Sequence, residues 1–159
     1  ILEINVAKSL IDKVKVEELS TILLIVEKQI KVVNSSLSEY EKAEKFLNLD
    51  DEFHETLFSM ANKSYLWDVV AKLKTHYYRV RYLLNLRNQD DMFKVCEQHK
   101  KIIEAIYNKD EKALIEDYHS HIYEGLKDLP SILEKYHYSI NTPPYLRKGI
   151  NVRNGNYSS

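Results

Sequence analysis

Apolar side chains recur at helical spacing along most of the chain. Between Val16 and about Ser36 they fall three or four residues apart, which places them on one face of a helix: Leu19, Ile22, Leu23, Val26, Ile30 and Val33. The same pattern predicts further helices over six other segments: Ile1 to about Lys13, about Ser38 to Met60, Ser64 to about Asn88, Asp90 or Asp91 to about Tyr107, Asp110 to about Glu124, and Ser131 to Ile140.

Short polar breaks separate these predicted helices. Ser38 followed by Glu41 has the spacing of a capping box, which marks a helix start. Asn62 with Lys63, Asn108, and Gly125 with Pro130 are expected to end the helices that precede them. The chain has only 3 Gly and 3 Pro, so it can form few hairpin turns. We therefore expect an all-α fold, an antiparallel helical bundle of six to seven helices.

The length and composition fit one folded domain. A chain of 159 residues with 44% hydrophobic and 30% charged residues can bury a substantial core. From Asn141 onward the sequence has no apolar period and is rich in Asn, Gly and Ser. We expect residues 1–140 to form the domain and residues 141–159 a flexible tail. Because the chain begins at Ile1, within a predicted helix, we also expect a segment to be missing before it.

Charge and cysteine content exclude several classes of function. The net charge is −1 and the basic residues are spread along the helices, so the electrostatic footprint of a nucleic-acid-binding protein is absent. A single cysteine, Cys96, excludes an internal disulfide and fits a reducing cytoplasm. No apolar run reaches the roughly 20 residues that span a bilayer. We expect a cytoplasmic protein that does not bind DNA through this segment.

Three histidines and an aspartate are expected to converge inside the bundle. Asp50 and His54 stand four residues apart, which places their side chains about 5 to 6 Å apart on one helix face. His99 lies ten residues before the break at Lys109 and His121 twelve after it. Both histidines therefore stand roughly 15 to 18 Å from the same turn, at one level of an antiparallel helix pair.

A shared metal ion would explain why these polar residues lie on apolar helix faces. A single histidine at such a position is more often a core residue with a hydrogen-bonded neighbour. Several imidazoles and a carboxylate buried without a common partner, however, would cost about 1 to 3 kcal/mol each. Mixed imidazole and carboxylate ligands suit Zn, Ni, Fe or Mn. Asp51, three residues before His54, is an equally good carboxylate ligand on this reasoning, whereas His119 falls on the face opposite His121.

Two stretches of sequence resemble a known family. LDDEFHETLFSMAN, from Leu49 to Asn62, resembles the D-x-x-F-H…N signature of the FCD domain, the C-terminal effector-binding domain of the FadR subfamily of GntR transcription regulators. HKKIIEAIYNKDEKALIEDYHSHI, from His99 to Ile122, resembles the second half of that signature, and the resemblance extends over most of the chain to about Ser139. It implies a divalent metal, with Zn or Ni the first candidates and Mn or Fe further ones. The implied ligands are Asp50, His54, His99 and His121.

The resemblance also implies a function and partners. Such a domain would sense a small carboxylate effector through the metal, as part of a homodimer that binds operator DNA through an N-terminal winged helix-turn-helix domain. It would not be an enzyme. We name Arg79 as a candidate effector contact, although it could equally be a surface arginine. The alternatives are a metal-dependent hydrolase with a helical-bundle active site, in which the metal would activate water, and a structural or dimerisation bundle whose histidines bind nothing.

Overall fold

The regular elements of this protein are all helices in the part of the chain that the structure describes. The computed structural model describes residues 2–72 and 89–126. Their helices are α1 (Leu2–Lys8), α2 (Val16–Val33), α3 (Glu39–Met60), a helix at residues 64–72, α5 (Gln89–Tyr107) and α6 (Glu111–Leu126). The predicted all-α bundle is confirmed, with six helices in these ranges. Three predicted segments lie outside the described residues: residues 73–88 of the predicted helix from Ser64, the predicted helix from Ser131, and the predicted tail at 141–159.

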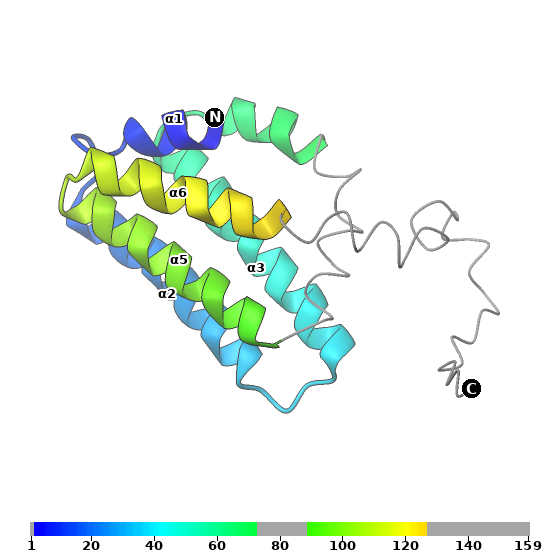
Figure 1. Ribbon diagram of the computed structural model, residues 1–159. Coiled ribbons are helices and arrows are strands. Elements are labelled where there is room, and N and C mark those ends of the chain that lie inside the picture. Colours follow the sequence, from blue (N-terminus) through cyan, green and yellow to red (C-terminus); the bar gives the residue numbers. More distant parts are fainter. Residues whose placement is uncertain (1, 73–88, 127–159) are drawn as a thin grey trace, which may run out of the picture.

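The helices pack as two hairpins with α1 across them. Helix α2 is joined to α3 by a short loop, and α5 is joined to α6 by a tight turn (Figure 1). Helix α2 packs against both α3 and α5, so it holds the two hairpins together. Helix α1 packs against α6 and α3. This arrangement encloses one interior, onto which α3, α5 and α6 all face.

Local hydrogen bonds form the predicted start of α3 and the predicted ends of α3 and α5. The Glu41 amide donates to Ser38 Oγ at 3.3 Å and the Ser38 amide to Glu41 Oε2 at 3.1 Å, which completes the predicted capping box of α3. Asn62 and Lys109 both adopt a positive φ of 56° just after α3 and α5. The amide of the following residue then donates a hydrogen bond to a carbonyl oxygen in the last turn of the helix. Lys63 donates to Phe58 O at 2.8 Å, and Asp110 donates to Ala105 O at 2.9 Å.

One predicted helix end was wrong, and another lies at the edge of the described residues. The first helix ends at Lys8 rather than near Lys13, because the Ser9 hydroxyl bonds Val6 O at 2.7 Å and the next amides bond three residues back, in turns. Leu10 and Ile11 in these turns are nevertheless buried, which explains the misleading apolar pattern. Gly125, expected to interrupt, lies inside α6, which runs to Leu126. A single glycine costs a helix only about 1 kcal/mol, so it need not end one.

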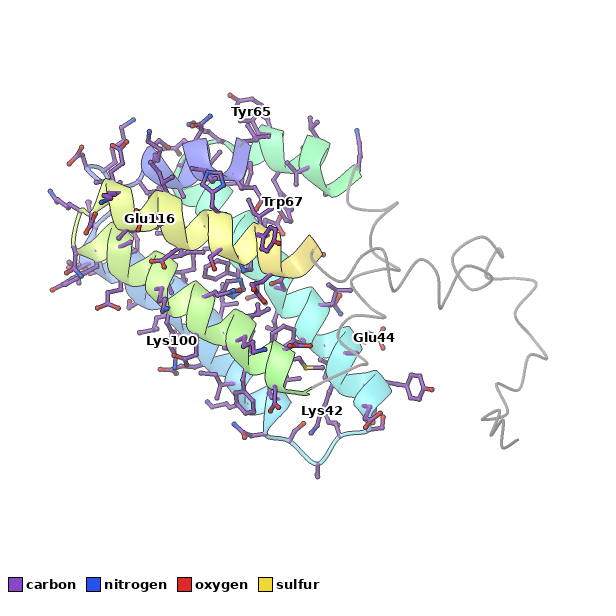
Figure 2. All side chains as sticks on the ribbon, in the orientation of Figure 1. Lys42, Glu44, Tyr65, Trp67, Lys100 and Glu116 are labelled. Carbon is purple, nitrogen blue, oxygen red and sulfur yellow. The ribbon has the colours of Figure 1, made fainter. Side chains whose placement is uncertain are left out.

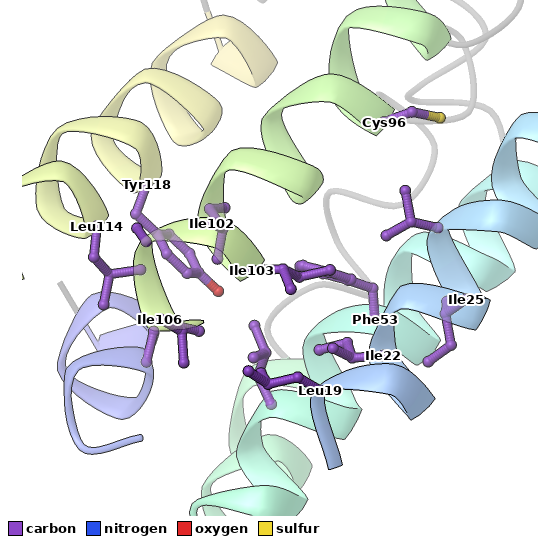
Figure 3. Packing of buried hydrophobic residues seen from close by; sticks show 14 of the residues in the cluster. Leu19, Ile22, Ile25, Phe53, Cys96, Ile102, Ile103, Ile106, Leu114 and Tyr118 are labelled. Atoms are coloured by element: carbon purple, nitrogen blue, oxygen red, sulfur yellow. The ribbon is translucent and has the colours of Figure 1, made fainter. Parts of the chain in front are cut away.

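Apolar residues fill the interior and charged ones cover the outside. Figure 2 shows side chains such as Lys100 and Glu116 on the outer surface of the bundle. In the interior, Phe53 of α3 and Tyr118 of α6 point toward Ile102 and Ile103 of α5 (Figure 3). None of the helices in the described ranges is long and apolar enough to cross a membrane. Polar residues also lie in this core, namely Gln29, Asp50, His54 and His99.

Candidate metal centre

The structure brings the four candidate ligands together. Asp50 and His54 come from α3, His99 from α5 and His121 from α6, and one donor atom from each lies within 4.8 Å of the others. We call these four residues the His/Asp cluster. Asp50, His54 and His99 are 6%, 3% and 0% exposed, and His121 is half-buried. The cluster is therefore a group of polar side chains inside the bundle, and its most exposed member, His121, lies on α6.

The spacing of the donor atoms fits a shared cation. His54 Nε2 lies 3.2 Å from His121 Nε2, and His99 Nε2 lies 3.4 Å from Asp50 Oδ1. The other carboxylate oxygen, Asp50 Oδ2, is 4.0 Å from His54 Nε2. Two ligand atoms that each lie about 2.1 Å from one metal must be roughly 3 to 4 Å apart. The donor set and its spacing therefore fit a divalent transition metal.

Each imidazole of the cluster has an oxygen atom beside its Nδ1. His99 Nδ1 lies 2.9 Å from Gln29 Oε1, and His121 Nδ1 lies 3.0 Å from Gln98 Oε1. His54 Nδ1 lies 3.3 Å from the Glu3 carboxylate and 3.2 Å from the Tyr118 hydroxyl. Amide and carboxylate oxygens can only accept, so a hydrogen bond from an imidazole to any of these oxygens requires the proton on Nδ1. In the neutral rings each Nε2 is then left as a lone pair suited to a metal.

The two closest nitrogens need a positive charge between them. With protons on Nδ1, His54 and His121 face each other through bare Nε2 atoms 3.2 Å apart. Two lone pairs at this distance repel one another, and in a buried site little water screens the repulsion. A metal ion, or a proton on one ring, removes the repulsion. The electrostatics of the cluster therefore favour a bound cation.

Aromatic side chains pack against the histidine rings of the cluster. The Phe53 ring stacks on His99, with ring centroids 3.7 Å apart and planes 10° from parallel. Tyr118 is fully buried beside His54. Burial, and next the nearby Glu3 charge, raises the pKa of Tyr118 well above its ordinary value. The Tyr118 hydroxyl therefore stays neutral at physiological pH.

Of the other candidate residues, the structure describes Asp51 and His119. Asp51 is half-buried and does not belong to the His/Asp cluster, so the geometry selects Asp50 of the two aspartates. His119 is exposed, as expected from its helix face. Arg79, the candidate effector contact, lies outside the described residues.

Sequence reasoning missed the residues that surround the cluster. Glu3, Gln29, Gln98 and Tyr118 all contact a cluster histidine. Gln29 could have been identified as a buried residue from the sequence, because it stands three residues after Val26 and four before Val33 on the apolar face of α2. A glutamine on such a face needs a buried partner.

A helical bundle with convergent ligand-type side chains in its interior has the architecture of a small-ligand-binding domain. Comparison with family models gives a match to the FCD domain over residues 1–124, and the chain belongs to the FCD domain family. FCD domains are regulatory, effector-binding domains, which favours the sensor interpretation over the hydrolase. Searches among curated proteins and solved structures gave no match.

Proposed function

We propose that this chain is the effector-binding domain of a GntR/FadR-type transcription regulator that senses a small carboxylate metabolite through a bound divalent metal. Asp50, His54, His99 and His121 would hold the metal. The observation that carries this proposal is the convergence of one carboxylate and three imidazole Nε2 atoms, from rings that each have an oxygen atom beside Nδ1. Zn or Ni fits this donor set best, and Mn or Fe also accepts it.

The protein residues prepare a site for an anion. When bound, the metal supplies a positive charge that a carboxylate oxygen can neutralise. Asp50 contributes one negative charge, so the cluster with a divalent ion stays positive enough to attract an anion. Phe53 and Tyr118 keep the surroundings apolar, which strengthens this attraction by excluding water.

The position of the cluster suggests how binding is transmitted. Its members lie on α3, α5 and α6, so a ligand that changes their spacing changes the packing of three helices. A ligand that prefers one packing shifts the population toward it. In a regulator of this type a homodimer would pass the change to separate domains that bind operator DNA.

The first test is the metal content of the purified protein. We expect close to one divalent ion per chain by elemental mass spectrometry, and loss of most of it in His99→Ala. His119→Ala is the matched control, because His119 is an exposed histidine on α6 and should leave the metal in place. Absence of metal, with no better affinity for added Zn or Ni than in His99→Ala, would contradict the proposal.

The second test is a screen of short hydroxy-, keto- and dicarboxylic acids. At least one should raise the melting temperature of the metal-loaded protein, because ligands of the native state add stability. The same compound should do little for metal-stripped or Asp50→Ala protein, while Asp51→Ala should respond like the wild type. If only neutral compounds act, or if carboxylates act equally without metal, the metal has a structural role and the sensor proposal fails.

A further inference from the structure

His54 differs from the other cluster histidines in the partner at its Nδ1. His99 and His121 each contact a neutral glutamine oxygen. His54 Nδ1 lies 3.2 Å from the Tyr118 hydroxyl and, in addition, 3.3 Å from the carboxylate of Glu3. The Glu3 side chain is 19% exposed, so water screens this contact only in part. A carboxylate at Nδ1 makes the opposite ring nitrogen a stronger donor than a neutral amide does.

Glu3 belongs to a helix that contributes no ligand to the cluster. Helix α1 lies against α3 and α6 (Figure 1), and Ile4 and Ala7 anchor it in the main hydrophobic core. Val6 packs in a small apolar cluster with Phe58 and Trp67, and Lys8 pairs with Glu111 of α6 at 2.7 Å. The contact of Glu3 with His54 is therefore the point at which α1 reaches the His/Asp cluster.

We propose that Glu3 is a positioning residue of the metal centre and that it couples metal binding to the docking of α1. This inference rests on the proposed function, since it requires a metal at the cluster. Glu3 holds the His54 ring with its Nε2 toward the cluster.

Thermodynamic linkage makes the effect of docked α1 on metal affinity equal to the effect of bound metal on the docking of α1. If docked α1 strengthens metal binding through Glu3, then bound metal must stabilise docked α1 by the same factor. Removing a carboxylate that contacts the outer ring nitrogen of a metal-bound histidine typically lowers metal affinity by about 10- to 100-fold. Glu3 is not a ligand itself and is partly exposed, so we expect its removal to lower metal affinity by about 10-fold, near the lower end of this range.

Two glutamates on neighbouring helices offer a matched pair of variants. Glu3→Gln keeps the size and a hydrogen-bonding oxygen but removes the charge beside His54. Glu111→Gln removes a charge of the same sign that contacts α1 through Lys8 and lies outside the cluster. Circular dichroism and melting of both metal-free variants establish that they fold.

The experiment measures two quantities in wild type and both variants. Competition with a zinc chelator gives the Zn affinity, which should fall about 10-fold in Glu3→Gln and stay unchanged in Glu111→Gln. Hydrogen exchange with and without Zn gives the protection of the α1 amides of Val6, Ala7 and Lys8. Zn should slow their exchange in the wild type and in Glu111→Gln, but far less in Glu3→Gln.

The outcomes separate this inference from the proposed function. If the wild type binds no Zn at the cluster, the proposed function fails and the inference falls with it. If the wild type binds Zn and Glu3→Gln shows the same affinity and the same Zn-dependent protection, the inference alone is overturned. An equal loss in Glu3→Gln and Glu111→Gln would also overturn it, because general loosening of α1 would then explain both.

Discussion

At the scale of single residues, Gln29 shows how buried polar groups serve the cluster. Its side chain is fully buried on α2, and its Oε1 accepts a hydrogen bond from His99 Nδ1 at 2.9 Å. Among the described residues, its Nε2 has no hydrogen-bond partner. An unsatisfied buried donor costs about 1 to 3 kcal/mol. A leucine would avoid this cost, so the amide is better explained by its control of the His99 ring than by stability.

Gln29→Leu should therefore separate metal affinity from stability. The substitution removes the unsatisfied Nε2 but leaves the His99 Nδ1 proton unpaired, so the metal-free stability should change by less than about 1 kcal/mol. Metal affinity should fall about 10-fold, because His99 loses the partner that orients it. Urea unfolding and chelator competition measure the two quantities. An unchanged affinity would show that Gln29 does not position His99.

Cys96 provides a probe of the core near the cluster. It is fully buried on α5, three residues before His99, and burial raises the pKa of its thiol to about 12. Only the thiolate reacts with alkylating reagents. At pH values well below 12 the folded protein should resist iodoacetamide, whereas denatured protein should react fully, as mass spectrometry would reveal. Rapid labelling of the native protein would contradict the burial of this face of α5.

At the scale of elements, the turn between α5 and α6 sets the relative height of His99 and His121. Lys109 adopts a left-handed φ of 56° in this turn. For a residue with a Cβ that conformation costs about 1 to 2 kcal/mol, which glycine largely avoids. The exposed pair of Lys109 with Asp12, at 3.9 Å, gives little in return.

Lys109→Gly should consequently stabilise the domain by up to about 1 kcal/mol, with the metal site intact. The matched control is Lys101→Gly, an exposed lysine in the interior of α5, where glycine should destabilise by about 1 kcal/mol. Urea unfolding of the two variants gives opposite signs if the left-handed turn is the cause. Equal destabilisation of both variants would contradict the expectation.

The sequence predicted elements better where a local rule decides the structure. The capping pattern of Ser38 and the breaks at Asn62 and Asn108 depend on neighbours in sequence, and all three are confirmed. The end of α1 was missed because turn residues after Lys8 also bury apolar side chains. The convergence of the candidate ligands followed from residue spacing along one helix and from the number of residues between each histidine and the turn.

The partners of the cluster histidines could not be predicted in this way. His99 meets Gln29 across 70 positions of sequence, and only the packing of α2 on α5 brings them together. His54 meets Tyr118 across 64 positions, again through packing between helices. Helical periodicity gives the face on which a residue lies, but it does not give the rotation of one helix against another.

At the scale of the whole molecule, the His/Asp cluster joins helices that are distant in sequence. Asp50, His54, His99 and His121 lie on α3, α5 and α6, while Gln29 and Glu3 extend the network to α2 and α1. A metal held by this network would act as a cross-link at the centre of the bundle. Its binding would then stabilise the folded domain as a unit, since the unfolded chain has no preformed site.

Thermal stability should accordingly rise with the free concentration of the metal. Above the dissociation constant, each tenfold increase adds about 1.4 kcal/mol to the free energy of unfolding. For a domain of about 150 residues this corresponds to roughly 3 to 6 °C in melting temperature. Calorimetry over several decades of buffered Zn should show a continuing rise in the wild type and in His119→Ala. His121→Ala should show almost none, because His121 supplies the ligand from α6. A melting temperature that does not depend on Zn in the wild type, or a rise of equal slope in His121→Ala, would mean that Zn does not bind the folded state through this cluster.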